Sequence, residues 1–368
     1  MNLKLRFVMG LVIIIALVVG VLFVLQTIQT DNVSKNPRLG GLFGLTGFAS
    51  FAGESSRDGF MMAIEDYNKP VDYVIEDYQS DMKTTLSSVK KLIEVDDMQI
   101  IIGPEWEFGA VISPLAEEKK ALFITPWLTI EPEWTSPEYF MSAMPREQIY
   151  TDFAIKYVAQ KGVKKIAIIQ TQDDFAITVG KTIIQAAKQN GITIIQSFSV
   201  TEDSSDYRSI ILKINTLGVD AIYTIMQTDN SQAQLNKQLK ELNIQLPIYV
   251  HYARAESDNY LTAAKNSAEG IIYVSPKESK KMSEFNKKFF EKYNRAPAIS
   301  AATAYDITTL ILKAHDEGYD KPEEVYNYLN EQKGYEGYYG TYSFENGFVK
   351  NGDAVMKTIE NGKRIELE

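Results

Sequence analysis

The 368-residue chain contains no cysteine, which excludes disulfides, thiolate metal sites, a cysteine nucleophile and lipid attachment at an N-terminal cysteine. It has only two histidines, His251 and His315, so a zinc site built from several histidines is excluded as well. Basic residues are fewer than acidic ones. The 38 Lys and Arg against 48 Asp and Glu give a net charge of −10, which argues against nucleic acid as a partner.

What remains is an ordinary globular composition, apart from the N-terminus. The chain is 45% hydrophobic and 23% charged, and its length predicts two domains. Residues 7–25 carry no charge and are close to the roughly 20 residues that span a bilayer. Because no small-x-small cleavage site follows, we predict an uncleaved membrane anchor at 7–25. A cleaved secretory signal is the alternative.

The basic residues Lys4 and Arg6 lie on the short side of this apolar run, which predicts that residues 1–6 stay in the cytoplasm. Residues 26–37 are polar and contain a proline, as is typical of a linker. The rest of the chain is therefore expected on the extracytoplasmic face of the membrane, tethered by the N-terminal helix, or secreted or periplasmic if the segment is cleaved.

Apolar strands and amphipathic helices alternate along the rest of the chain in two series. Strands are predicted at 39–45, 71–75, 100–102 and 122–124, and then at 165–170, 192–198, 220–226 and 248–250. Helices of the second series are predicted at 148–160, 175–190, 207–215 and 232–242. This alternation predicts an α/β fold with parallel sheets covered on both faces. Three helices (282–293, 299–314 and 323–332) and two strands (339–344 and 355–359) complete the chain.

The stretch QIIIGPEWEFGAVISPLAEEKKALFITPWLT, residues 99–129, contains two of these strands. Both end in aromatic and polar loops at the same, carboxyl end of a parallel sheet, where ligands bind in open α/β folds. We therefore expect these loops to form half of a small-molecule cleft. The candidate residues are Glu105, Trp106, Glu107, Phe108, Trp127, Leu128 and Thr129.

Motifs that would indicate an enzyme are incomplete. The segment GGLFGLTG at 40–47 has Phe43 where a dinucleotide fingerprint needs glycine. The triplet GKT at 180–182 lies inside a predicted helix rather than in a phosphate-binding loop. His315 is at a helix carboxyl end, where it suits the helix dipole. His251 follows a strand but has no serine partner in a G-x-S-x-G setting. We therefore expect no catalytic residue, cofactor or metal.

Several phrases, in this order and spacing, resemble a known family. They are GLTGFASFAGESSRDGFMMAIEDYN, YVIEDYQSD, IIIGP, FITPWLT, KKIAIIQTQDDFA and GVDAIYTIMQ. The chain resembles type I periplasmic binding proteins, in particular the branched-chain amino-acid-binding (leucine-binding protein-like) family that serves ABC importers. The resemblance covers about residues 39–344.

The resemblance implies a two-lobed fold in which each lobe is a parallel-sheet α/β sandwich and the ligand lies between the lobes. Lobe 1 is expected at 38–145 and 276–335, and lobe 2 at 146–275 and 336–368. The chain would cross between lobes near 143–146, 274–276 and 334–337. Binding would close the hinge.

The resemblance also implies ligand contacts. Thr129, with the backbone around Trp127, matches a carboxylate-binding loop. In lobe 2 the matching positions are Asp174 and Phe175, Gln227, and the pair His251 and Tyr252. The sequence departs from the family where it has Glu105 and Glu107 in place of a serine loop, and where it has no acid near His251 before Glu256.

Those departures bear on the ligand. Unpaired glutamates in a closing cleft would repel a carboxylate, whereas aromatic side chains attract cations. Either Glu105 and Glu107 point away from an amino acid ligand, or the ligand is not a branched-chain amino acid but an amide or an amine. The expected partner is an ABC permease. Two alternatives remain, a ligand-sensing ectodomain of the same fold that acts in signalling, and a Rossmann-type enzyme.

Overall fold

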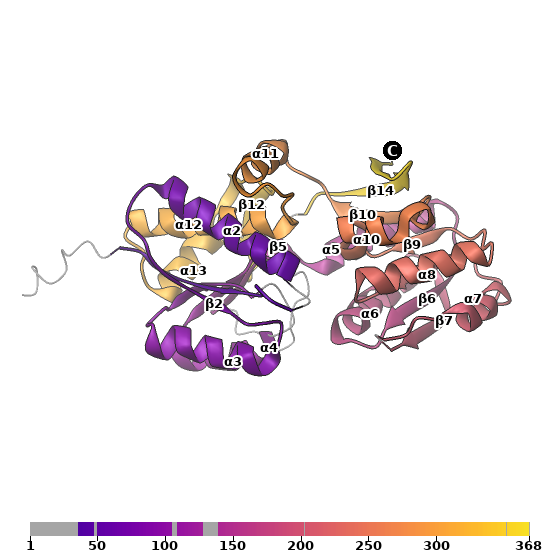
Figure 1. Ribbon diagram of the computed structural model, residues 1–368, viewed down its shortest axis with the longest axis horizontal. Helices are drawn as coiled ribbons and strands as arrows, with labels where there is room; N and C mark the ends of the chain where they lie inside the picture. Colours follow the sequence, from indigo (N-terminus) through magenta and orange to yellow (C-terminus); the bar gives the residue numbers. More distant parts are fainter. Residues whose placement is uncertain are drawn as a thin grey trace, which may run out of the picture.

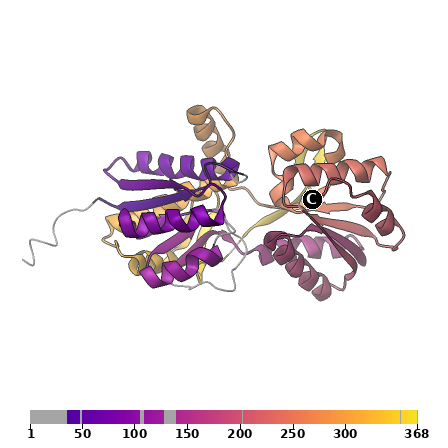
Figure 2. The same cartoon turned by 60° about the horizontal axis from the view of Figure 1, so that its bottom comes forward.

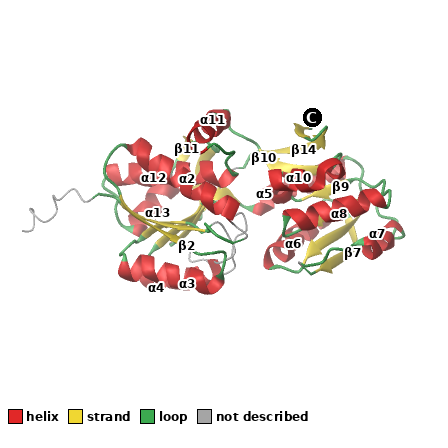
Figure 3. Ribbon diagram, in the orientation of Figure 1, coloured by secondary structure: helices red, strands yellow, loops and turns green. Residues whose placement is uncertain are grey.

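The computed structural model describes residues 36–47, 50–104, 109–127, 139–201, 203–350 and 352–367. These residues form two lobes that lie side by side along the long axis of the molecule and meet at a narrow waist (Figures 1 and 2). Each lobe has one twisted sheet with helices packed on both of its faces (Figure 3). The predicted α/β fold with two parallel-rich sheets is confirmed.

The sheet of lobe 1 has the strand order β11-β12-β13-β5-β4-β3-β1-β2. Strands β2, β1, β3, β4, β5 and β13 are parallel, and β12 and β11 are added antiparallel at one edge. The strands are β1 (Arg38–Phe43), β2 (Asp72–Asp77), β3 (Ile100–Ile102), β4 (Leu122–Thr125), β5 (Phe140–Pro145), β11 (Lys333–Glu336), β12 (Thr341–Glu345) and β13 (Phe348–Val349).

The sheet of lobe 2 has the order β15-β14-β10-β9-β8-β6-β7. Its five strands from β7 to β10 are parallel, and β14 and β15 form an antiparallel hairpin on the edge. The strands are β6 (Lys165–Thr171), β7 (Thr193–Val200), β8 (Ala221–Ile225), β9 (Ile248–Val250), β10 (Ile272–Pro276), β14 (Ala354–Glu360) and β15 (Lys363–Glu366).

Helices cover both sheets. In lobe 1 they are α2 (Ser50–Tyr67), α3 (Met82–Lys90), the π-helical turn η1 (Lys91–Val95), α4 (Gly109–Lys119), α11 (Met282–Tyr293), α12 (Ile299–Asp316) and α13 (Pro322–Glu331). In lobe 2 they are α5 (Glu147–Gln160), α6 (Asp174–Gln189), α7 (Arg208–Asn215), α8 (Asp229–Glu241), α9 (Tyr252–Ala255), α10 (Asp258–Ala264) and the 3₁₀ turn η2 (Lys265–Ala268).

Buried strands whose side chains are apolar on both faces explain why helices cover both sides of each sheet. In β3, Ile100 and Ile102 pack with α2 and α12 on one face, whereas Ile101 packs with α3 and α4 on the other. In β6, Ile166 and Ile168 likewise face α5 and α6, and Ala167 and Ile169 face α7 and α8. Because side chains alternate along a strand, both faces of each sheet are apolar and both need helices.

The chain passes between the lobes three times, after β5, after β10 and after β13. The third passage differs from the expectation. Strands β12 and β13 belong to the sheet of lobe 1, where Phe348 pairs with Ser142 of β5. The crossing therefore runs from Val349 to Ala354 rather than near 334–337. The turn at Asn346-Gly347 closes a hairpin within lobe 1, and only pairing with β5 decides which sheet that hairpin joins.

No helix among the described residues is long and apolar enough to cross a membrane. The predicted anchor at 7–25, with its flanks at 1–6 and 26–35, lies outside the described residues.

Close packing of α2 on α12 depends on Gly59. A Cβ atom at this position would fall on the carbonyl oxygen of Ala301. We expect Gly59→Ala to lower the free energy of unfolding by about 2 kcal/mol, because backbone atoms of α12 cannot yield to the added methyl group. Urea titration followed by circular dichroism measures this loss.

Gly180→Ala is the matched control, because a Cβ there would meet only the end of the Gln170 side chain. Alanine is also favoured over glycine inside a helix by about 1 kcal/mol. Similar losses for the two variants would contradict the packing argument.

Candidate ligand cleft between the lobes

A cleft of about 890 Å³ lies between the lobes, at the carboxyl ends of both sheets. That volume is within the range of sites that hold drug-sized ligands. Lobe 1 and lobe 2 each supply one wall. The lining includes Phe51, Ala52, Trp127, Met282, Asn286, Phe290, Pro297, Ile299 and Tyr339 from lobe 1, and Gln227, Thr228, Asp229, Asn230, Arg254, Glu256, Ser257, Asp258, Asn259, Ser275 and Arg364 from lobe 2.

Two of the predicted site residues line this cleft from opposite walls. Trp127 lies two residues after the end of β4 and is half-buried against the core of lobe 1. Gln227 follows β8, and its backbone N–H donates to the Thr171 hydroxyl at 3.0 Å. One predicted residue therefore lies on each wall of the cleft, and its contact with ligand stays a prediction.

Six other predicted site residues lie outside the described residues: Glu105, Trp106, Glu107, Phe108, Leu128 and Thr129. Their contacts with ligand stay predictions. Asp174 is the first residue of α6, and only its backbone is described.

The remaining three predicted residues are buried behind the wall of lobe 2. His251 Nε2 is 3.2 Å from Glu147 Oε1, and the Tyr252 hydroxyl donates to Glu147 Oε2 at 3.3 Å. The Phe175 ring meets His251 edge-on at 5.2 Å. All four side chains are less than 8% exposed, and none of them is among the residues that line the cleft. As direct ligand contacts, Phe175, His251 and Tyr252 stay predictions.

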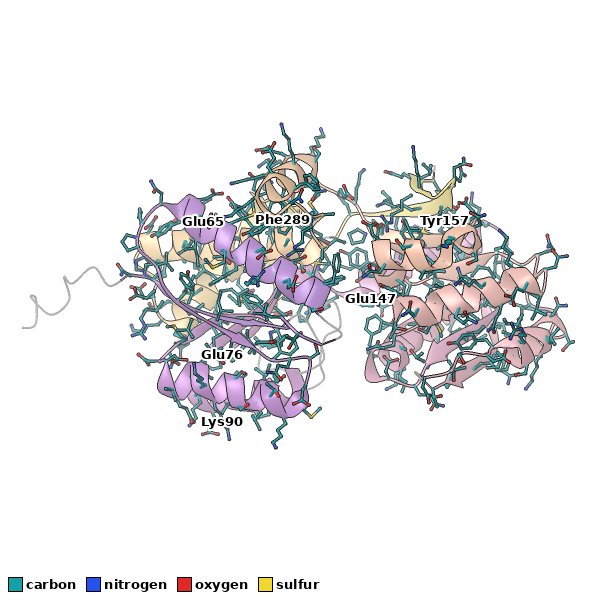
Figure 4. The ribbon with its side chains drawn as sticks, viewed as in Figure 1. Glu65, Glu76, Lys90, Glu147, Tyr157 and Phe289 are labelled. Carbon is teal, nitrogen blue, oxygen red and sulfur yellow. The ribbon has the colours of Figure 1, made fainter. Side chains whose placement is uncertain are left out.

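Glu147 explains why these aromatic residues turn inward. It is the first residue of α5, at the waist between the lobes (Figure 4). Its carboxylate also accepts from the Thr151 hydroxyl one helical turn away, at 3.2 Å. One buried acid thus joins α5 to the end of β9, and the sequence gives no local signal for this long-range pairing.

Charged side chains on the wall of lobe 2 are arranged in pairs. Arg254 lies 3.2 Å from Asp229, which also accepts from the Ser257 hydroxyl at 2.6 Å. Glu256 accepts from Ser275 at 2.6 Å and pairs with Lys357 at 2.9 Å and with Arg364 at 3.4 Å. Arg364 NH1 also contacts Asp258 at 2.8 Å. Glu256, the acid nearest in sequence to the expected ammonium contact, is therefore already neutralised by cations from the C-terminal hairpin.

A tyrosine pair joins the two lobes. The hydroxyls of Tyr150 in α5 and Tyr339 before β12 lie 3.1 Å apart. Asp306 of α12 fixes the Tyr339 end, since its carboxylate accepts the backbone N–H of Tyr338 at 2.7 Å and of Tyr339 at 2.8 Å, and the Tyr342 hydroxyl at 3.0 Å. Burial raises the pKa of the Asp306 carboxyl to about 7, against the opposing effect of these hydrogen bonds.

The sequence interpretation missed the part of the cleft that α11, the start of α12 and the C-terminal hairpin supply. One feature of the sequence could have indicated this part of the cleft. Phe289 and Phe290 are adjacent on an amphipathic helix, so only one of them can face the core. Phe289 is buried, and Phe290 is 54% exposed on the cleft side. No comparable signal marks Arg364, because its place in the cleft depends on β15 pairing with β14.

Comparison with known proteins agrees with this architecture. Residues 37–363 match the family model described as periplasmic binding protein. A leucine-, isoleucine-, valine-, threonine- and alanine-binding protein from Pseudomonas aeruginosa is 24% identical over 343 residues, covering 88% of this chain and 90% of the relative. That alignment spans both lobes.

Two solved structures have the same fold. One is the substrate-binding protein of a branched-chain amino acid transporter from Streptococcus pneumoniae in complex with isoleucine, with a TM-score of 0.77 and 21% identity, covering 90% of this chain and all of that chain. The other is an ABC transporter solute-binding protein from R. palustris in complex with benzoate, with a TM-score of 0.77 and 15% identity, covering 90% and 96%. The chain belongs to the periplasmic binding protein family and has the type I fold.

Proposed function

We propose that this protein captures an amino acid or a chemically similar small solute between its lobes, outside the cytoplasm, and delivers it to an ABC permease. The cleft carries this proposal, because both lobes line it and three chain crossings join them. Such an arrangement suits hinge closure around a ligand. We propose in addition that residues 7–25 tether the protein to the membrane.

The relatives support transport of a solute but leave its class open. The Pseudomonas aeruginosa relative is named for aliphatic amino acids and threonine, whereas the R. palustris structure contains the aromatic acid benzoate. Both types of compound therefore belong in a ligand screen. Sensing by the same fold is the second candidate function, and it predicts the same binding without transfer to a permease.

Thermal-shift measurements on the protein from Pro37 onward test capture directly. We expect at least one amino acid to raise Tm by several degrees, because a ligand at 100 times its Kd stabilises the folded state by about 2.7 kcal/mol. Trp127→Ala should fold and lose that shift, since Trp127 lines the cleft. The control Phe153→Ala changes an exposed aromatic residue of α5 that does not line the cleft.

No stabilisation by any amino acid, amide or amine would contradict the proposal. An equal shift in wild type and Trp127→Ala would place binding elsewhere. Reconstitution with a candidate permease and its ATPase in vesicles then separates transport from sensing, because only transport predicts uptake that depends on the binding protein.

A further inference from the structure

The wall that lobe 1 contributes to the cleft is largely aromatic. Four aromatic side chains line it, Phe51, Trp127, Phe290 and Tyr339. We call these four residues the aromatic wall. Glu278, in the crossing segment between β10 and α11, is the one charged lining residue outside lobe 2 that the structure describes, and its carboxylate lies 4.0 Å from Lys357 Nζ of lobe 2. Phe51 is 44% exposed and Phe290 54% exposed. Single exposed apolar residues are common, but several in one concave surface indicate a binding surface.

Local structure holds Phe290 in place. Helix α11 buries Phe285 and Phe289 in lobe 1, and Phe289 packs under the Arg295 guanidinium with 5.1 Å between them. Because Phe290 is the next residue, it is turned by about 100° from Phe289 and faces the cleft with Asn286, one turn earlier. Pro297 and Ile299, which link α11 to α12, extend the same surface.

Among the described residues of the opposite wall, the cations already have carboxylate partners. Both arginines that line it are already paired, Arg254 with Asp229 and Arg364 with Asp258 and Glu256. A ligand carboxylate at this end of the cleft would have to compete with those acids, at a cost in desolvation. An uncharged group that lies flat against aromatic side chains meets no such cost, and aromatic rings interact favourably beyond their buried area.

We propose that the aromatic wall is a subsite for an aromatic group of the solute, so that the protein prefers aromatic amino acids to branched-chain aliphatic ones. This inference rests on the proposed function, since it specifies the solute that the same cleft captures. The polar end of the solute lies at the strand ends near Trp127 and Gln227, and its ring lies between α11 and the start of α2.

Isothermal titration calorimetry with L-phenylalanine and L-leucine as probes tests the inference. We expect wild type to bind phenylalanine at least tenfold more tightly, a difference of about 1.4 kcal/mol. The double variant Phe51→Ser with Phe290→Ser should lose at least tenfold in phenylalanine affinity and less than twofold in leucine affinity. Both residues are exposed in the unliganded protein, so the variant is expected to fold, and circular dichroism checks this.

Phe153→Ser is the matched control. Phe153 lies on α5, is 41% exposed and does not line the cleft, so its replacement should change neither affinity. If leucine binds as tightly as phenylalanine, or if the double variant weakens both probes equally, the inference fails and the proposed function stands. If neither probe binds wild type but another amino acid, an amide or an amine does, the inference fails and the proposed function stands. If none of these compounds binds, both fail.

Discussion

Replacing Asp306 by asparagine is expected to lower the free energy of unfolding by about 3 kcal/mol at pH 7. The Asp306 carboxylate accepts two backbone N–H groups and one hydroxyl, and Asp306 is 1% exposed. Asparagine keeps the shape but turns one acceptor oxygen into an NH₂ group, which faces the backbone N–H of Tyr338 or of Tyr339 whichever way the amide is turned. A buried donor without an acceptor costs about 1–3 kcal/mol, and hydrogen bonds to charged groups are the stronger ones. Urea unfolding monitored by tryptophan fluorescence measures the loss.

The deficit of Asp306→Asn should also depend on pH. Because the folded-state pKa of Asp306 is raised from 3.8 to about 7, its contribution to stability is fully present below pH 4 and is lost as pH rises through 7. Wild type should therefore exceed the variant by more at pH 5 than at pH 8. In the protonated carboxyl, the Tyr342 hydroxyl can reverse its role and accept.

Asp316→Asn is the control on the same helix. Asp316 is half-exposed and pairs with Lys69 at 2.7 Å on the surface, where such pairs contribute less than about 1 kcal/mol. A deficit for Asp306→Asn no larger than that of Asp316→Asn, or one that grows with rising pH, would contradict the argument.

Glu147→Ala is expected to lower the free energy of unfolding by about 3 kcal/mol, because it removes an acceptor that His251, Tyr252 and Thr151 share inside lobe 2. Removing one partner of a buried polar cluster costs about 3–5 kcal/mol, and relaxation reduces the loss. Because α5 begins at the first crossing between lobes, we also expect proteolysis near residues 145–147 to accelerate. Urea titration and limited trypsin digestion measure the two effects.

Asp152→Ala, also on α5, is the control, because it removes a carboxylate that is not part of the buried cluster. Asp152 accepts from Gln148 at 2.7 Å and is only partly buried, so the expected loss is less than 1 kcal/mol. If the two alanine variants were equally stable, Glu147 would contribute no more than a surface hydrogen bond.

Elements with strong local patterns could be predicted from the sequence alone. The strand at 248–250 and the helix at 282–293 have the predicted bounds, and most others differ by one to three residues. Apolar periodicity and glycine stops such as Gly191 act within a few residues, so a single chain shows them. The GKT triplet lies within α6, and His315 lies in the last turn of α12, as predicted.

Features that depend on distant partners could not be predicted. The family resemblance made His251 and Tyr252 candidate ligand contacts, but their hydrogen bonds to Glu147, more than 100 residues earlier, could not be foreseen. Likewise, Asp306 accepts hydrogen bonds from residues 338–342. The local sequence around Asp306 does not indicate these partners, and neither does the sequence of 338–342. The family resemblance supplied the two-lobed plan, whereas the third crossing depends on β13 joining β5.

That pairing of β13 with β5 also constrains when the protein can acquire its structure during synthesis. Ser142 of β5 pairs with Phe348, α2 packs on α12, and β10 pairs with β14. In each case the first element lacks its partner until the later one has been synthesised. A ribosome makes the N-terminal half of lobe 1 first, yet that lobe lacks three strands and three helices until almost the whole chain has emerged. Non-local contacts of this kind form slowly. Neither sheet is therefore complete before residues 341–366 have been made, so that folding of both lobes is delayed until those residues have left the ribosome.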